Sequence, residues 1–145
     1  MEKRPMEAAG SQVEREGAER SLRKRALEAA ERYLERLECT ILDVEWTSPS
    51  GEVADIVAID PTGTVTITEV AISRGSELPE MEANAEKQRR AEKLAIDYLM
   101  SHEFEDGTAI RFDAISIVVV KEGEAGFGRA LLKHERGCFN RGFAA

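Results

Sequence analysis

The stretch VADIVAIDPTGTVTITEVAI, residues 53–72, decides the fold, because two apolar runs flank a compact turn signal. Residues 53–59 are apolar at nearly every position, which is typical of a strand inside a sheet. In Asp60-Pro61-Thr62-Gly63, Asp stands first, Pro second and Gly fourth, as a type I turn that closes in a left-handed glycine prefers. The stretch therefore predicts a β-hairpin with a three-residue loop and residues 65–72 as the returning strand.

Helical and strand-like periods alternate on either side of this hairpin. Before it, apolar residues at three- and four-residue steps predict an amphipathic helix over about residues 14–37, and an alternating pattern predicts a half-buried strand over residues 40–46. After it, we expect a second helix over residues 80–104, a strong strand over residues 109–120, and an edge strand or short helix in the basic tail from Arg129. The order α-β-β-β-α-β predicts an α/β fold, a mixed sheet flanked by helices.

Length and composition restrict the class of protein. The 145 residues suit one domain, which we expect to cover residues 14–145 behind a flexible leader of residues 1–13. No apolar run approaches the roughly 20 residues of a membrane span, so we expect no membrane partner. Two cysteines, Cys39 and Cys138, are too few for a disulfide framework, which predicts a reducing cytoplasm. The net charge of −8 argues against binding nucleic acid by bulk attraction alone.

Two carboxylates interrupt one face of the predicted hairpin. If residues 61–63 form the loop, Asp55 stands directly opposite Glu69, because side chains repeat every two residues along a strand. The rest of that face is apolar and consists of Val53, Val57, Ile59, Val65 and Ile67. Like charges at opposed positions repel unless a cation neutralises them, and carboxylate oxygens are the ligands that Mg²⁺ or Mn²⁺ prefers. Two alternatives remain: both groups meet water at a strand end, or a different loop length places them on opposite faces.

The position that follows Glu69 on the same face is Ala71. In a site that cleaves phosphodiesters, a lysine at this position would polarise the attacking water and stabilise the charge that develops on the phosphate. The residues therefore predict a candidate metal pair without the cationic group that phosphoryl chemistry needs.

Several segments, taken in chain order, are similar to those of one family. The chain resembles the YraN-type uncharacterised family of the restriction-endonuclease-like PD-(D/E)xK superfamily, which also includes tRNA-endonuclease-like and Holliday-junction-resolvase-like folds. The segments that carry the resemblance are residues 27–34, 45–47, 51–58, 67–73, 87–90 and 111–113, together with His134 and Phe139.

The resemblance implies site residues as well as a fold. It places Asp55 and Glu69 at the metal-binding positions, for Mg²⁺ or Mn²⁺, and Glu28 as a carboxylate of the first helix near them. It also places Ala71 where the family has its catalytic lysine, and we expect Lys87, at the start of the second helix, to be the candidate that could replace it. DNA or another nucleic acid is the partner that such a fold implies.

The function predicted from these residues is that of a nuclease-family, nucleic-acid-associated protein whose metal-dependent phosphodiester hydrolysis is weakened or lost. The alternative is a non-enzymatic binding or interaction module that keeps the fold only. Two basic clusters are consistent either with solvated helix faces or with surfaces that follow a phosphate backbone. They comprise Arg20, Arg23, Lys24 and Arg25 in the first helix and Lys87, Arg89, Arg90 and Lys93 in the second.

Overall fold

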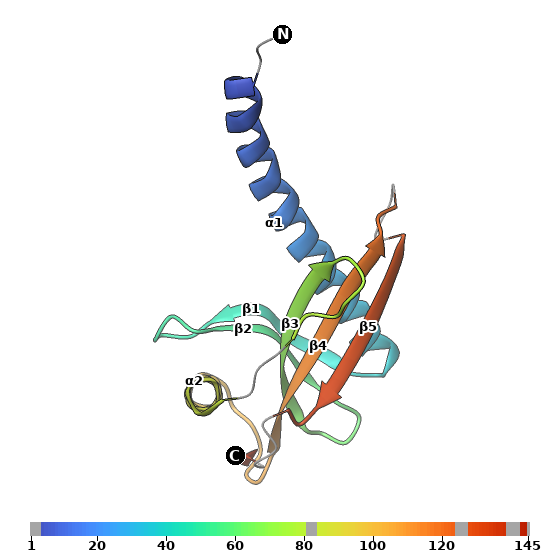
Figure 1. Ribbon diagram of the computed structural model, residues 1–145. Helices are drawn as coiled ribbons and strands as arrows, with labels where there is room; N and C mark the ends of the chain where they lie inside the picture. Colours follow the sequence, from blue (N-terminus) through green and yellow to red (C-terminus); the bar gives the residue numbers. More distant parts are fainter. Residues whose placement is uncertain (1–3, 81–83, 124–127, 139–142, 145) are drawn as a thin grey trace.

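The protein forms a six-stranded mixed sheet with one helix on each face in the computed structural model (Figure 1). The structure describes residues 4–80, 84–123, 128–138 and 143–144. In chain order its elements are α1 (Arg4–Arg36), β1 (Thr40–Thr47), β2 (Val53–Ile59), β3 (Val65–Arg74), α2 (Ala85–Ser101), β4 (Ala109–Lys121), β5 (Arg129–Arg136) and β6 (Phe143–Ala144).

The strands follow the chain order β1-β2-β3-β4-β5, and the short β6 pairs with β4. The β3–β4 pair is parallel, with α2 as the connection between its strands, and the remaining pairs are antiparallel. A parallel pair needs such a crossover, because the chain must return to the same end of the sheet. The α/β mixed sheet flanked by helices that the sequence predicts is confirmed, and it is compatible with a restriction-endonuclease-like fold.

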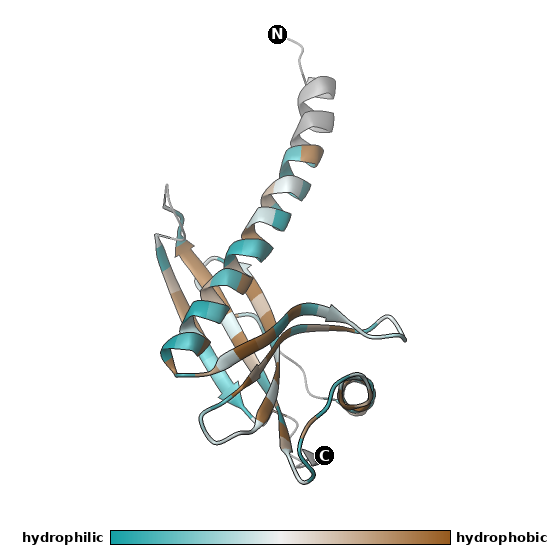
Figure 2. Ribbon diagram, turned by 180° about the vertical axis from the view of Figure 1, so that it is seen from behind, coloured by the Kyte–Doolittle hydropathy of each residue, from teal (hydrophilic) through white to brown (hydrophobic). Residues whose placement is uncertain are grey.

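The C-terminal half of α1 covers one face of the sheet. Its buried residues Ala26, Leu27, Ala30 and Leu34 recur at helical spacing and pack on Ile56, Val70, Ile115 and Ile117. The N-terminal half extends past the strands, and Figure 2 shows the solvent-facing side of the helix as hydrophilic. Residues 12–21 are exposed apart from the partly exposed Gly17, so the sheet holds this helix by its second half.

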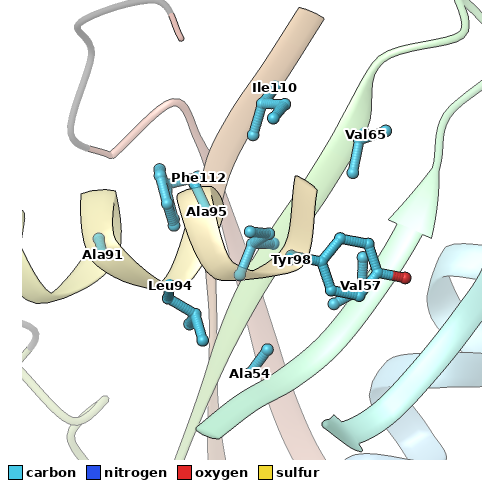
Figure 3. Packing of buried hydrophobic residues seen from close by; sticks show 10 residues of the cluster. Ala54, Val57, Val65, Ala91, Leu94, Ala95, Tyr98, Ile110 and Phe112 are labelled. Atoms are coloured by element: carbon cyan, nitrogen blue, oxygen red, sulfur yellow. The ribbon is translucent and has the colours of Figure 1, made fainter. Parts of the chain in front are cut away.

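The helix α2 covers the opposite face (Figure 3). Its apolar side consists of Ala91, Leu94, Ala95 and Tyr98, which lie against Val57 and Val65 of the hairpin and against Ile110 and Phe112 of β4. The Asn84 side chain accepts a hydrogen bond of 2.8 Å from the backbone N–H of Lys87 and caps the start of the helix. This cap fixes where the first turn of α2 meets the sheet.

Several element bounds differ from the expected ones. The helix α1 begins at Arg4 rather than near residue 14, whereas α2 ends at Ser101 rather than at residue 104. Of the two options for the tail, the structure contains the edge strand, β5. The flexibility of residues 1–13 and the single-domain division stay predictions, and Phe139 lies outside the described residues.

The hairpin turn forms as predicted. Gly63 has φ +88°, in the left-handed region, and its N–H donates to the Asp60 carbonyl at 2.9 Å. The Asp60 side chain also accepts hydrogen bonds from the backbone N–H groups of Thr62 and Thr64. The expected pairs of Ile59 with Val65 and of Val57 with Ile67 are present.

The predicted register does not continue to Asp55. The β2–β3 pairing ends at Ile56 and Thr68, so the expected cross-strand pairs of Asp55 with Glu69 and of Val53 with Ala71 do not form. Val53, expected in the core, is 47% exposed, and Ala54 is buried instead. The side-chain alternation of β2 therefore breaks at the residue that the sequence singles out as a metal ligand.

Candidate functional site

An open pocket of about 380 Å³ lies where the broken end of the hairpin meets both helices. Asp55 of β2 and Glu69 of β3 both line it, although they do not pair across the strands. Arg23 of α1 and Lys87 of α2 line it from the two helices. The pocket therefore brings together two of the predicted carboxylates and the predicted replacement lysine.

The Asp55 carboxylate uses both of its oxygens within the protein. Its Oδ1 lies 2.6 Å from Nη2 of Arg23, and its Oδ2 accepts a hydrogen bond of 2.8 Å from the backbone N–H of Val70. The Asp55 side chain is 13% exposed. A carboxylate with so little access to water needs a counter-charge or hydrogen-bond donors, and here it has both.

The neighbouring strand explains why Asp55 turns into this position. Val44 pairs with Ile56 and Trp46 pairs with Ala54, so Glu45 stands across from Asp55. Glu45 has φ +54°, a left-handed conformation that breaks the alternation of β1 at the same level. Accordingly Ala54 packs on the α2 side of the sheet and Ile56 on the α1 side, although regular alternation would place both on one face.

Glu69 contacts the second cation of the pocket, Lys87. Its Oε1 lies 3.0 Å from Nζ of Lys87, and the Glu69 side chain is 45% exposed. Lys87 belongs to the first turn of α2, where the helix dipole disfavours a positive charge, and Glu69 offsets this cost. Because the pair is exposed, it contributes at most about 1 kcal/mol and can open readily.

The remaining predicted site residue is elsewhere. Glu28 is exposed on α1 and is not among the residues that line the pocket. Four charged residues that the sequence analysis did not assign to the site do line it, namely Arg23, Glu52, Arg90 and Asp113. One signal could have identified Arg23: it precedes the buried Ala26 and Leu27 by three and four residues, so it continues the sheet-facing stripe of α1.

A divalent cation does not fit the site as its residues are arranged. The described residues contain no group of three or more His, Cys, Asp or Glu side chains that could hold a metal ion. Arg23 and the Val70 N–H engage both oxygens of Asp55, and Lys87 lies on Glu69. The Mg²⁺ or Mn²⁺ that the sequence predicts at Asp55 and Glu69 stays a prediction, and it requires Arg23 to move away.

A buried ionic network holds the strands next to the pocket. Asp113 of β4 accepts hydrogen bonds from Nε of Arg111 at 2.8 Å, from Nε2 of His134 at 3.0 Å and from the backbone N–H of Gly137 at 3.0 Å. Burial raises the pKa of Asp113, but these donors outweigh it and bring the pKa to about 2. The Tyr33 hydroxyl lies 3.0 Å from Nδ1 of His134 and so links α1 to the network.

Neither cysteine supplies a thiolate nucleophile. Burial, together with the charges of Asp113 and Glu69, raises the pKa of the Cys138 thiol to about 11. Burial and the charge of Asp60 raise the pKa of Cys39. The thiol form has little nucleophilic reactivity. The charged side chains of the pocket are therefore the groups that could take part in a reaction.

The chain is similar to known proteins over most of its length. A protein-family model described as "Uncharacterised protein family UPF0102" matches residues 27–117, more than half of the chain. The chain belongs to this family. The predicted YraN-type resemblance is thereby confirmed, since UPF0102 is the YraN family.

Two relatives illustrate the extent of the similarity. A UPF0102 protein of Myxococcus xanthus (strain DK1622) is 37% identical over 117 residues, which cover 79% of this chain and 86% of the relative. A UPF0102 protein of Desulforamulus reducens (strain ATCC BAA-1160 / DSM 100696 / MI-1) is 31% identical over 110 residues, which cover 71% of this chain and 89% of the relative. The UPF0102 match includes Glu28, Asp55, Glu69 and Lys87, whereas Arg23 lies just before its first residue.

The helices also bear on the expected partners. Among the described residues, no helix combines the length and the apolar character that crossing a membrane requires. The cytoplasmic location stays a prediction.

Proposed function

We propose that this UPF0102 protein associates with nucleic acid and that its metal-dependent phosphodiester hydrolysis is weakened or lost. The observation that carries the proposal is the state of Asp55, whose two oxygens are bound by Arg23 and by the Val70 N–H. Both oxygens of this carboxylate already accept hydrogen bonds within the protein, and the guanidinium of Arg23 stands where a metal ion would need to approach Oδ1.

The strand that carries Glu69 adds a second argument. Ala71 stands where the family has a catalytic lysine, and a methyl group can neither polarise a water molecule nor stabilise a phosphorane-like transition state. Loss of a single transition-state donor commonly costs about a hundredfold or more in rate. Lys87 is the group in the pocket that could supply part of this charge, but Glu69 holds its ammonium at 3.0 Å.

The basic side chains at the pocket supply the contacts for a phosphate backbone, although acidic side chains line the same cavities. Arg23, Lys87 and Arg90 line the pocket, and a neighbouring hollow along α1 is lined by Arg20 and Lys24. Arg23 belongs to both cavities, so the basic side chains form a continuous series from α2 to α1. Local cations of this kind can bind phosphates although the whole chain has a net charge of −8.

A binding assay tests the association. Fluorescence anisotropy with duplex, single-stranded and branched DNA should show binding that weakens as salt rises. Lys87→Gln/Arg90→Gln should weaken binding and lower the slope of log K against log salt by about two, one for each phosphate contact. Lys133→Gln is the control, because Lys133 lies on β5, away from the pocket, and pairs with Glu135. Equal losses in both variants would contradict a nucleic-acid surface at the pocket.

A cleavage assay tests the weakened hydrolysis. The native chain, incubated with the same DNAs in Mn²⁺, should cleave slowly or not at all. Ala71→Lys restores the missing ammonium group, so cleavage that is seen in this variant alone would identify a degenerate enzyme. Efficient cleavage by the native chain would refute the proposal.

The alternative, a non-enzymatic interaction module, is favoured by the same internal pairing of the carboxylates. It predicts that neither the native chain nor Ala71→Lys cleaves or binds any of the three DNAs.

A further inference from the structure

The guanidinium of Arg23 joins two oxygen atoms that face one point of the pocket. Its Nη2 lies 2.6 Å from Oδ1 of Asp55, and its Nη1 donates to the carbonyl oxygen of Val70 at 2.6 Å. The second oxygen of Asp55 accepts the N–H of the same Val70. The three residues therefore form a closed ring of hydrogen bonds at the end of the β2–β3 pairing, and the ring replaces the backbone pairing that the strands lose there.

The two oxygens are of the kinds that a hard cation selects. Carboxylate and backbone carbonyl oxygens are the usual protein ligands of Mg²⁺ and of related ions. Arg23 supplies a positive charge and two directed donors at that point, so it satisfies both oxygens without a metal. Its planar geometry is suited to this bridging, since two N–H groups on different nitrogens point the same way.

The packing of α1 holds Arg23 in place. Leu22 before it is buried, and Ala26 and Leu27 one turn after it pack against the sheet, so the backbone at Arg23 cannot turn away without breaking that contact. The Arg23 side chain is 36% exposed, whereas Asp55 is 13% exposed, so the arginine reaches in from the pocket rim to a carboxylate that is largely shielded.

The other cations of the pocket are bound differently. Lys87 contacts Glu69 through a single pair of atoms, and Arg90 lies 4.0 Å from Glu86 within α2. Arg23 is the cation that lies between these two oxygens.

We propose that Arg23 is a built-in replacement for the divalent cation: it holds Asp55 and the Val70 carbonyl together in a metal-independent site, and removing its charge exposes a Mn²⁺-binding site. The inference rests on the proposed function, because it states why hydrolysis is weakened, and it makes a claim about metal binding that does not depend on catalysis.

The test is Mn²⁺ binding, followed by the electron paramagnetic resonance signal of free Mn²⁺. The native chain should show no saturable binding at the pocket. Arg23→Gln should gain one saturable site, with an affinity about tenfold or more above any binding by the native chain, because a positive charge no longer repels the ion. Arg23→Gln/Asp55→Asn should lose this site again. Arg20→Gln is the matched control, since it removes an equal charge from the same helix and should gain no site.

The outcomes separate clearly. Mn²⁺ binding by the native chain as tight as that by Arg23→Gln, or no gain in Arg23→Gln, would overturn the inference. If Arg23→Gln is unfolded in the presence of a chelator, Mn²⁺ should restore its circular dichroism spectrum. The double variant Arg23→Gln/Asp55→Asn should not be restored by Mn²⁺. Failure of Mn²⁺ to restore Arg23→Gln would also overturn the inference.

The inference and the proposed function can fail independently. A native chain that binds Mn²⁺ tightly but cleaves no DNA would refute the role of Arg23 and leave the weakened hydrolysis standing. A native chain that binds neither Mn²⁺ nor DNA would refute nucleic-acid association and leave the role of Arg23 intact.

Discussion

Asp113→Asn should destabilise the protein strongly, because Asp113 is the acceptor on which the buried network depends. The Asp113 side chain is 1% exposed and accepts from Arg111, His134 and Gly137. Removing one partner of a buried pair typically costs about 3–5 kcal/mol. Arg111 is 28% exposed and keeps Asp60 at 3.1 Å, so we expect the low end of that range, about 3 kcal/mol, in urea unfolding at neutral pH.

The pH dependence gives a second measure of the same group. The pKa of Asp113 is about 2 in the folded chain against an ordinary value of 3.8, a difference worth about 2 kcal/mol. A lowered pKa in the folded state stabilises the fold above the unfolded pKa, and this stabilisation is lost as pH falls through the folded pKa. The stability difference between native protein and Asp113→Asn should therefore shrink by about 2 kcal/mol between about pH 5 and about pH 2.

The control for both measurements is Glu135→Gln on β5. Glu135 is 53% exposed and pairs with Lys133 at 3.0 Å, so its loss should change stability by less than about 0.5 kcal/mol. A loss below about 1 kcal/mol in Asp113→Asn, or a stability difference that does not change with pH, would refute the reasoning about the network.

Three further predictions concern the elements that shape the pocket. Leu34→Ala should lower the free energy of unfolding by about 3 kcal/mol in urea titration, because Leu34 is 1% exposed between α1 and the sheet; a loss under about 1 kcal/mol would contradict that packing. Asn84→Ala should lower the free energy of unfolding by about 1 kcal/mol and lower the melting temperature, since it removes the cap on the N–H of Lys87. The conservative Asn84→Asp should keep the cap and the melting temperature of the native protein. Burial and the hydrogen bond to Asp43 raise the pKa of Tyr98, so Tyr98→Phe should leave the tyrosinate absorbance at about pH 10 unchanged. Loss of this hydrogen bond should cost about 1 kcal/mol of stability. A smaller tyrosinate signal in the variant would show that Tyr98 ionises normally.

The sequence was sufficient for the fold because its strongest signals are local. The Asp60–Gly63 turn depends on four consecutive residues, and their chemistry predicts both the hairpin and the register next to the loop. The core face of α1 likewise follows from helical spacing alone. The early start of α1 at Arg4 could not be predicted in this way, because residues 4–13 contain Pro5, Gly10 and scattered charges and have no apolar stripe to reveal a helix.

The site was harder to predict because it forms where the regular pattern stops. Strict alternation places Asp55 opposite Glu69, but the left-handed Glu45 on the adjacent strand breaks that alternation. The positive φ of a glutamate is not readable from sequence, since glutamate shows no preference for the left-handed region. Asp55 and Glu69 therefore line one pocket, but they do not form the direct cross-strand pair that the spacing predicted.

The charge of Arg23 shows most clearly what spacing along the chain cannot reveal. A cluster of basic residues on a helix is consistent with a solvated face or with a phosphate-binding surface, and in both cases its members would act alike. In the structure the members differ, because the burial of Ala26 and Leu27 directs Arg23 to the sheet, Arg25 lies 3.4 Å from Glu122, and Arg20 and Lys24 stay exposed. Asp55 then meets an arginine of its own chain, which supplies the counter-charge for this largely shielded carboxylate.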